Sequence, residues 1–147
     1  MTQDIDIGTI EQALIDKLYD NVTIRRYTNF IKKGDYDMPS LNGIDLWVHG
    51  RIPVESENNR ILFGSVYEVP IDITLLCRFR NRDKLTETVN DLCSEITRII
   101  YKSGKIASTN GYRLPINVVE DAIGDADNPE TYIITITITY EMILIPA

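Results

Sequence analysis

The sequence predicts an α+β fold: a mostly antiparallel sheet of four to five strands with helices packed on one face. Apolar and polar residues alternate from Val66 to Arg80 and again from Tyr132 to Leu144, as in strands whose two faces meet different surroundings. Between these runs, apolar residues from Leu85 to Ile100 recur about every 3.6 residues, as in a helix lying across a sheet. These patterns predict two packed layers.

The first expected element is a helix of about ten residues. Thr9 and Gln12 have the spacing of a capping box, in which each side chain satisfies a free backbone N–H of the first turn. A narrow apolar stripe follows at helical spacing: Ile10, Leu14 and Leu18. Such a narrow stripe predicts a helix at the surface of the molecule.

Residues 20–43 show no single pattern. Val22, Ile24 and Tyr27 could form a short strand, and the rest is rich in loop-forming residues. Alternation returns between Ile44 and Pro53. This strand and the one from Val66 to Arg80 are expected to pair as an antiparallel hairpin with an extended tip.

The second helix is expected to begin at Asp83, a good N-cap, and to end at Gly104, which suits a left-handed C-terminal cap. A strand should follow from Tyr112 to Val118, where Pro115 removes one hydrogen-bond donor and favours an edge or a bulge. The expected order is α-β-β-α-β-β, in a single α+β domain spanning residues 1–147.

The two long strands are the strongest indication of self-assembly. A globule of this length has a diameter of about 38 Å, whereas fifteen strand residues span about 50 Å. The strands must therefore bend, break (Pro70 makes a break plausible) or project beyond the globule. The run from Tyr132 to Leu144 would be prone to aggregation at an exposed edge, so either a central sheet position or a neighbouring copy should cover it.

Composition narrows the classes of function. The chain has 147 residues and a net charge of −7, and no Lys or Arg follows Arg113, so tight binding to nucleic acid phosphates is not expected. Cys77 and Cys93 are expected to be buried thiols of a reducing compartment. No apolar run is long enough to cross a membrane, and the N-terminus lacks the pattern of a secretory signal.

No catalytic, cofactor-binding or metal-binding motif is present, and none of these activities is expected. The only histidine, His49, has no nucleophile or carboxylate motif beside it and is expected to be structural. The acidic stretch 120–130 lacks the spacing of a calcium loop and is expected to be a solvated turn or a surface facing a partner or a lumen. The basic group from Arg78 to Lys84 is a solvated strand end, or pairs with acidic residues of a neighbouring copy.

With these elements in place, the chain resembles the tail terminator (tail completion) proteins of tailed bacteriophages. The resemblance is architectural. It rests on the short first helix, the hairpin strand that ends in VYEVPIDITLLCRFRNRDKL, the helix KLTETVNDLCSEITRIIYKSG and the final strand TYIITITITYEMIL. The acidic stretch 120–130 and the segment 20–43 have no counterpart in the family pattern.

The resemblance implies a virion protein of the tail or neck, assembled in the host cytoplasm into a ring of six copies. The ring would cap the tail tube, stop its polymerisation and join it to the neck or head connector, while DNA passes through the lumen without specific binding. An acidic or neutral lumen would suit this role, because it repels phosphates. No cofactor is implied.

Subunit and partner contacts are expected at the hairpin tip, along both long strands and in the acidic turn. The candidate interface residues are Arg60, Arg78, Arg80, Arg82, Asp125, Asp127, Thr135, Thr137 and Thr139. The alternative is a small cytoplasmic α+β ligand-binding module or enzyme subunit, or another neck or tail-tube protein of the same fold. The strand lengths favour the ring, and the absence of a catalytic cluster weighs against the enzyme.

Overall fold

A computed structural model describes residues 6–35, 43–55, 65–78, 82–107, 109, 111–122 and 131–144. It contains α1 (Ile7–Tyr19), α2 (Val22–Tyr27), β1 (Phe30–Lys33), β2 (Gly43–Gly50), β3 (Val54–Glu55), β4 (Ser65–Arg78), α3 (Arg82–Ser103), β5 (Gly111–Ala122) and β6 (Thr131–Leu144). The α+β class is as predicted.

The strands form one sheet in the order β1-β2-β4-β6-β5, and the two-residue β3 pairs with β4 as a sixth strand. The predicted pairing of β2 with β4 is antiparallel, as are the pairings of β4 with β6 and of β6 with β5. However, β1 runs parallel to β2. The sheet is therefore mixed, and the element order is α-α-β-β-β-β-α-β-β, not the predicted α-β-β-α-β-β.

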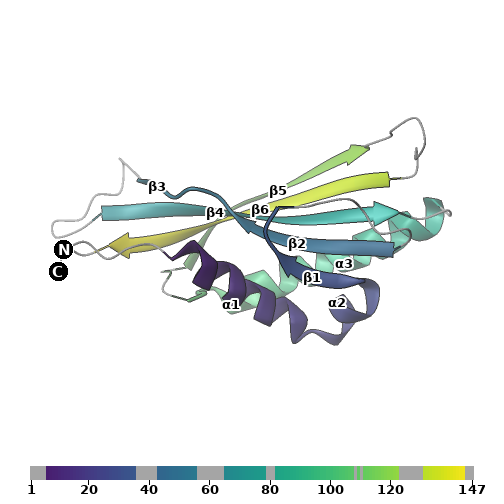
Figure 1. Ribbon diagram of the computed structural model, residues 1–147, viewed down its shortest axis with the longest axis horizontal. Coiled ribbons are helices and arrows are strands. Elements are labelled where there is room, and N and C mark those ends of the chain that lie inside the picture. The colour runs from purple at the N-terminus through teal and green to yellow at the C-terminus, as the bar shows by residue number, and fades with distance from the viewer. Residues whose placement is uncertain are drawn as a thin grey trace.

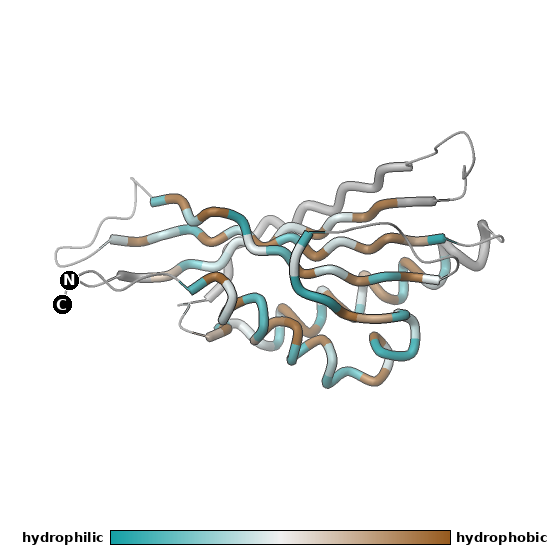
Figure 2. The backbone as a smooth tube through the Cα atoms, in the orientation of Figure 1, coloured by the Kyte–Doolittle hydropathy of each residue, from teal (hydrophilic) through white to brown (hydrophobic). Residues whose placement is uncertain are grey.

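All three helices lie on the same side of the sheet (Figure 1). Their apolar stripes meet the odd-numbered residues of β4 and the even-numbered residues of β2 and β6 in one core. The alternation of hydrophobic and hydrophilic residues is visible along β2 and β4 (Figure 2). None of the helices in the described ranges is both long enough and apolar enough to cross a membrane.

The segment 20–43 differs most from expectation, since Val22–Tyr27 is a helix and not a strand. The side-chain oxygen of Asn21 caps α2 by accepting the N–H of Ile24, at 3.0 Å. Ile24 is then fully buried in the core. The Asn21 amide also donates to Glu95 of α3, at 3.2 Å. Burial of Ile24 and this link to α3 outweigh the strand propensity of the local sequence.

The same Glu95 carboxylate accepts a hydrogen bond from Arg98, at 2.7 Å. This hydrogen bond is the main reason why the pKa of Glu95 lies below its usual range, and the Asn21 amide lowers it further. Both hydrogen bonds therefore favour the ionised form of Glu95.

The first helix begins earlier than predicted because Asp6 is its N-cap. The Asp6 carboxylate accepts the Thr9 hydroxyl at 2.7 Å and the Thr9 N–H at 3.1 Å, and these bonds lower the pKa of Asp6. The predicted capping box is therefore wrong: the Gln12 side chain donates to Asp16 instead. The second predicted N-cap, Asp83, lies within the first turn of α3.

The C-terminal cap of α3 is as predicted. Gly104 has a φ of +56°, in the left-handed region that favours glycine, and its N–H donates to the carbonyl of Ile100. Cys77 is fully buried, while Cys93 is only half-buried and packs against the core from α3. The two cysteines do not form a disulfide with each other.

The strand β4 passes through Pro70 without the break that its sequence allowed. The Pro70 carbonyl accepts the N–H of Arg51, at 2.8 Å. It therefore points towards the residues that connect β2 and β3. In an antiparallel strand the N–H and C=O of one residue share a side. The N–H that proline lacks would thus lie beside the connection from β2 to β3, where the pairing of strands is already interrupted. In β5, by contrast, the register shifts between Arg113 and Asn117, and this strand lies at the sheet edge, as Pro115 predicted.

The final strand, β6, is covered within the chain. It lies between β4 and β5, so its backbone is paired on both sides. Of the two expected ways of covering this strand, a central sheet position is the one found, and it protects the strand from aggregation. The free edges of the described sheet belong to β1 and β5.

Gly50 allows α1 to approach the end of β2. A Cβ atom at Gly50 would overlap the Cγ2 of Ile7, and the Gly50 N–H donates to the buried Glu11 carboxylate at 2.9 Å. We expect Gly50→Ala to lower the free energy of unfolding by about 1–3 kcal/mol, measured by urea denaturation. Gly8→Ala is the matched control in the first turn of α1. Its Cβ would lie 3.3 Å from Asp6 Oδ1, and alanine favours the helix. Equal losses in both variants would contradict this account.

Candidate interface: the helix-free face of the sheet

The face of the sheet opposite the helices is here called the helix-free face. Side chains alternate between the two faces of a strand, so this face carries the residues that lie between the core positions. From β2 it carries Asp45, Trp47 and His49; from β4, Val66, Glu68, Pro70, Asp72, Thr74, Leu76 and Arg78; and from β6, Ile133, Thr135, Thr137, Thr139 and Glu141.

A charged and polar network occupies its centre. Asp72 is only 8% exposed, and both of its carboxylate oxygens have partners. One accepts Arg51 Nε at 2.6 Å, and the other accepts the Thr137 hydroxyl at 2.8 Å. Arg51 directly follows β2, while Thr137 stands opposite Asp72 on β6. The network therefore links three strands across the face.

Beside this network the face is lined with threonine. Thr74 is buried opposite Thr135, and Thr139 stands opposite Pro70. The side chains of Thr135, Thr137 and Thr139 are all half-buried. These threonines surround the network with hydroxyl and methyl groups.

An aromatic cluster lies towards β1. The rings of Phe30 and Trp47 meet edge to face with centroids 5.3 Å apart, and Lys32 Nζ lies 4.4 Å from the Phe30 centroid. Nearby, the Asn29 amide donates to Asp45, at 3.0 Å. The indole N–H of Trp47 is buried and has no hydrogen-bond partner among the described residues.

The structure brings only part of the predicted interface together. Thr135, Thr137 and Thr139 share the helix-free face, and Arg78 lies half-buried at the end of β4 on the same face. Arg82 instead is the first residue of α3. The other predicted interface residues, Arg60, Arg80, Asp125 and Asp127, lie outside the described residues.

Sequence reasoning missed the residues that organise this face. The alternation from Val66 to Arg80 places Asp72 on the polar side of its strand, and that between Ile44 and Pro53 does the same for Arg51, but neither pattern links the two residues. Arg51 meets Asp72 because the register of β2 on β4 ends β2 beside this part of β4. That register cannot be read from either strand alone. An isolated acid within an aliphatic strand was the available signal, because a carboxylate in that setting needs a partner.

The only histidine of the sequence lies on this face. His49 stands opposite Asp72 in the strand register, but the hydrogen bonds to both Asp72 oxygens come from Arg51 and Thr137. Within the described ranges, no group of three or more His, Cys, Asp or Glu residues could hold a metal ion.

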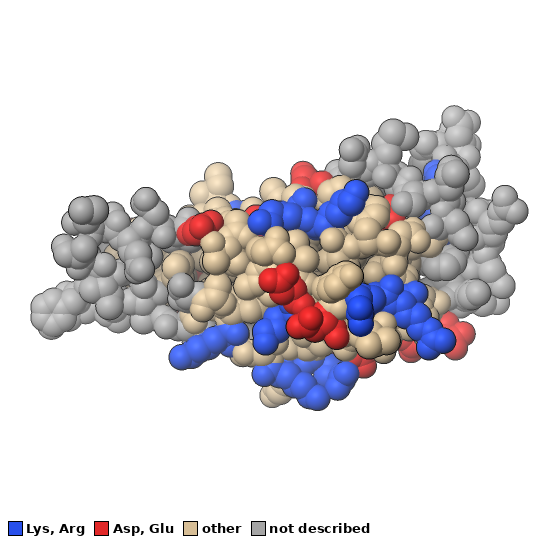
Figure 3. Space-filling view, turned by 60° about the horizontal axis from the view of Figure 1, so that its bottom comes forward, with Lys and Arg blue, Asp and Glu red and all other residues tan. Residues whose placement is uncertain are grey.

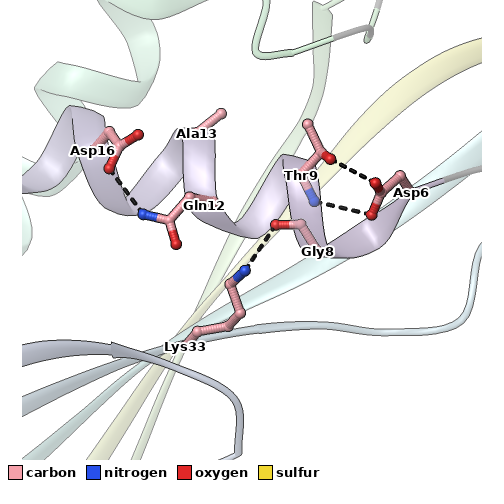
Figure 4. A pocket seen from close by; sticks show the side chains of 7 residues that line it. All are labelled: Asp6, Gly8, Thr9, Gln12, Ala13, Asp16 and Lys33. Atoms are coloured by element: carbon pink, nitrogen blue, oxygen red, sulfur yellow. Dashed lines mark hydrogen bonds between the residues drawn. The ribbon is translucent and has the colours of Figure 1, made fainter.

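A hollow runs along α1 on the helical side of the molecule (Figure 4). It is lined by Asp6, Gly8, Thr9, Gln12, Ala13, Asp16 and Lys33. Its polar groups pair with one another: Thr9 with Asp6, Gln12 with Asp16, and Lys33 Nζ with the Gly8 carbonyl at 3.1 Å. These contacts attach the end of β1 to the start of α1, so the hollow is best explained as part of the fold.

The sequence matches no protein-family model, and no curated protein matches it. Among solved structures, a chain of the "Virion of native gene transfer agent (GTA) particle" superposes with a TM-score of 0.62 at 8% sequence identity. The match covers 92% of this chain and 96% of that chain. The two chains therefore share a fold along almost their whole lengths.

Proposed function

We propose that this protein is a structural component of a phage-like virion that forms a ring at the end of the tail tube. The observation that carries the proposal is the shared fold with a chain of a gene transfer agent virion, which spans 92% of one chain and 96% of the other. The tail terminator role comes from the architectural resemblance of the sequence. In that role the ring would stop tube growth and join the tail to the neck.

The shape of the sheet supports assembly. The strands β4 and β6 each have 14 residues, which corresponds to about 46 Å of extended chain. The three helices of the described ranges all lie on one side of the sheet (Figure 1). On the opposite face Leu76 and Ile133 are buried, whereas Thr135, Thr137 and Thr139 of β6 remain partly exposed. The buried Asp72 carboxylate already has partners in Arg51 and Thr137. This face can therefore pack against another protein without leaving that charge unpaired.

The proposed mechanism is capping by shape, without a chemical step. A ring of identical copies presents one surface to the last subunits of the tube and a different surface to the neck. Because the second surface does not match the tube, no further tube subunit can add. The net charge of −7 suits a lumen through which DNA passes, since like charges prevent tight binding of phosphates.

The alternative, an enzyme subunit or ligand-binding module, has less support. His49 and Asp72 are the nearest approach to a catalytic pair on the helix-free face, and the hydrogen bonds of Asp72 are made with Arg51 and Thr137. Asp72 therefore fits a structural role better than that of a group orienting His49.

The test is to measure mass and tube length together. Light scattering after size exclusion should give a multiple of 16.8 kDa, and added protein should shorten tubes grown from the tube protein of the same virion, as seen by electron microscopy. An unrelated acidic protein of equal mass and concentration is the control. A 16.8 kDa monomer at high concentration, with tubes that keep lengthening in its presence, would remove the proposal.

A further inference from the structure

Charged side chains on the helical side of the molecule gather in patches of one sign (Figure 3). On α3 these patches follow a simple order along the helix. The helix buries one side in the core, through Val89, Leu92, Ile96 and Ile100. The opposite side is exposed, and we call it the outer face of α3: Glu87, Asp91, Ser94, Arg98, Tyr101 and Lys102.

The outer face carries its charges in two blocks. Glu87 and Asp91 lie in the first half of the helix. Arg98 and Lys102 lie in the second half. Both acids and both bases are exposed, so the face is acidic at one end and basic at the other.

The isolated helix gains little from this grouping. Residues four apart on a helix are neighbours, and like charges at that spacing destabilise it. Glu87, Asp91 and Glu95 follow one another at this spacing. Arg98 and Lys102 do the same. The ion pair between Glu95 and Arg98, at 2.7 Å, is the attraction that the described helix makes between the two blocks.

The helix dipole does not explain the grouping either. The dipole favours acids near the N-terminus and bases near the C-terminus, but its effect falls off within the first and last turns. Lys102 lies in the last turn of α3, whereas Asp91 and Arg98 lie outside both terminal turns. The charges in the middle of the helix therefore call for another source of stabilisation.

A second copy of the same helix would supply it. When two copies of α3 lie antiparallel, with a two-fold axis between Ser94 and Glu95, Asp91 and Arg98 are equally far from that axis. Each Asp91 then faces the Arg98 of the other copy. Glu87 and Lys102 are related in the same way. Every acid of the outer face thus meets a base, and each of the two pairs occurs twice.

The helix geometry allows all of these pairs at once. The span from Asp91 to Arg98 is about two turns, and that from Glu87 to Lys102 is about four, so the four side chains project on one side of the helix. Ser94 lies between the blocks, and its small side chain lets the two helices approach closely.

Arg98 can serve a second carboxylate. Its guanidinium donates to Glu95 through one nitrogen, its side chain is 51% exposed, and a guanidinium has five N–H donors. An open hollow lies beside it on α3, lined by Cys93, Ser94, Thr97, Arg98, Tyr101 and Lys102. This hollow leaves room for a side chain from a facing helix. Tyr101, which is 70% exposed, would gain cover at the rim of the contact.

We propose that two copies of this protein associate through the outer faces of α3, antiparallel and with the two-fold axis between Ser94 and Glu95. The charge order selects the occupant, because a face with two blocks of opposite sign is matched by the same face reversed. The inference goes beyond the proposed function and does not rest on it: a ring repeats a head-to-tail contact, whereas this contact is two-fold. Between rings, the same contact would join two of them.

Two charge-reversal variants test the contact. E87K/D91K makes the outer face basic, and R98E/K102E makes it acidic, so each variant repels its own copies. We expect each alone to raise the dissociation constant of the pair at least about tenfold. An equal mixture of the two should associate again, because all of the facing charges are then opposite.

The combined variant E87K/D91K/R98E/K102E is the sharpest test. It exchanges the two blocks, keeps the net charge of the wild type and restores opposite charges across the two-fold axis, so we expect it to pair with itself. Sedimentation velocity over a wide range of protein concentration measures all of these species. Added salt should weaken the wild-type pair, because its ion pairs are exposed.

Matched controls make the same charge changes on other helices. D16K/D20K alters two exposed acids four residues apart on α1, and R25E/R26E alters two exposed bases on α2. We expect both to associate as the wild type does. Circular dichroism and thermal melting should show every variant folded.

The outcomes separate this contact from the ring. Each reversed variant should halve the mass of the wild-type species, from dimer to monomer or from two joined rings to one. Unchanged masses in both reversed variants overturn the contact, as does a mixture and a combined variant that both stay dissociated. A wild type that is monomeric without tubes at every concentration overturns the contact as well, whereas the ring is removed only if tubes also keep lengthening in its presence.

Discussion

Replacing Ile136 with alanine should lower the free energy of unfolding by about 3–4 kcal/mol. Ile136 is fully buried in the middle of β6, and the strand register places it between Ile73 of β4 and Val118 of β5. The substitution removes apolar atoms from a packed site and leaves a cavity there. Because a domain of this kind is stable by about 5–15 kcal/mol in total, the loss should be visible as a large fall in the urea midpoint.

Thr135→Ala is the matched control. Thr135 is the preceding residue of the same strand, but it lies half-buried on the helix-free face. Its replacement should cost about 1 kcal/mol or less, mainly through lost strand propensity. Ile136→Val, which keeps most of the volume, should cost about 0.5–1.5 kcal/mol. Similar losses for Thr135→Ala and Ile136→Ala would mean that the two faces of β6 are assigned wrongly.

The features that sequence predicted well are those that local periodicity determines. β4, β6 and α3 each bury one face, so their apolar residues repeat at the spacing of the element. Gly104 was predicted as a cap because a left-handed residue ends many helices, and glycine adopts that conformation without strain. The shared face of Thr135, Thr137 and Thr139 follows from the same two-residue alternation.

The features that sequence missed depend on contacts across the fold. Val22, Ile24 and Tyr27 have strand-forming side chains, yet Ile24 is buried from a helix that Asn21 caps and connects to Glu95. Asn21, three residues before Ile24, was the local signal for that helix. The parallel pairing of β1 with β2 had no local signal. Parallel neighbours are not joined by a tight turn, so no turn motif marks them.

A second large effect is expected at the centre of the helix-free face. Asp72→Ala should lower the free energy of unfolding by about 2 kcal/mol, because it removes two charge-assisted hydrogen bonds. The loss should stay below the cost of breaking a fully buried ion pair. The Arg51 side chain is 58% exposed, so water can solvate its charge once Asp72 is gone.

Coupling measurements identify the network. Thr137→Val combined with Asp72→Ala should cost less than the two single losses added together, by about 1 kcal/mol, because both variants remove the same hydrogen bond. Thr139→Val is the matched control, since Thr139 stands opposite Pro70 on the same face. Additive losses for Thr137 and Asp72 would contradict the network.

The position of the network of Asp72, Arg51 and Thr137 connects the stability of the fold with assembly. Arg51 begins the segment that leaves β2, and the exposed Ile52 and Val54 follow it directly. Asp72 therefore anchors the start of this exposed segment to the middle of the sheet. Asp72→Ala should free this segment and weaken assembly more than Ile136→Val, even where the two variants lose similar stability. Comparing their concentrations for half-assembly at a temperature where both are fully folded measures this difference, and equal values would show that the network supports the fold alone.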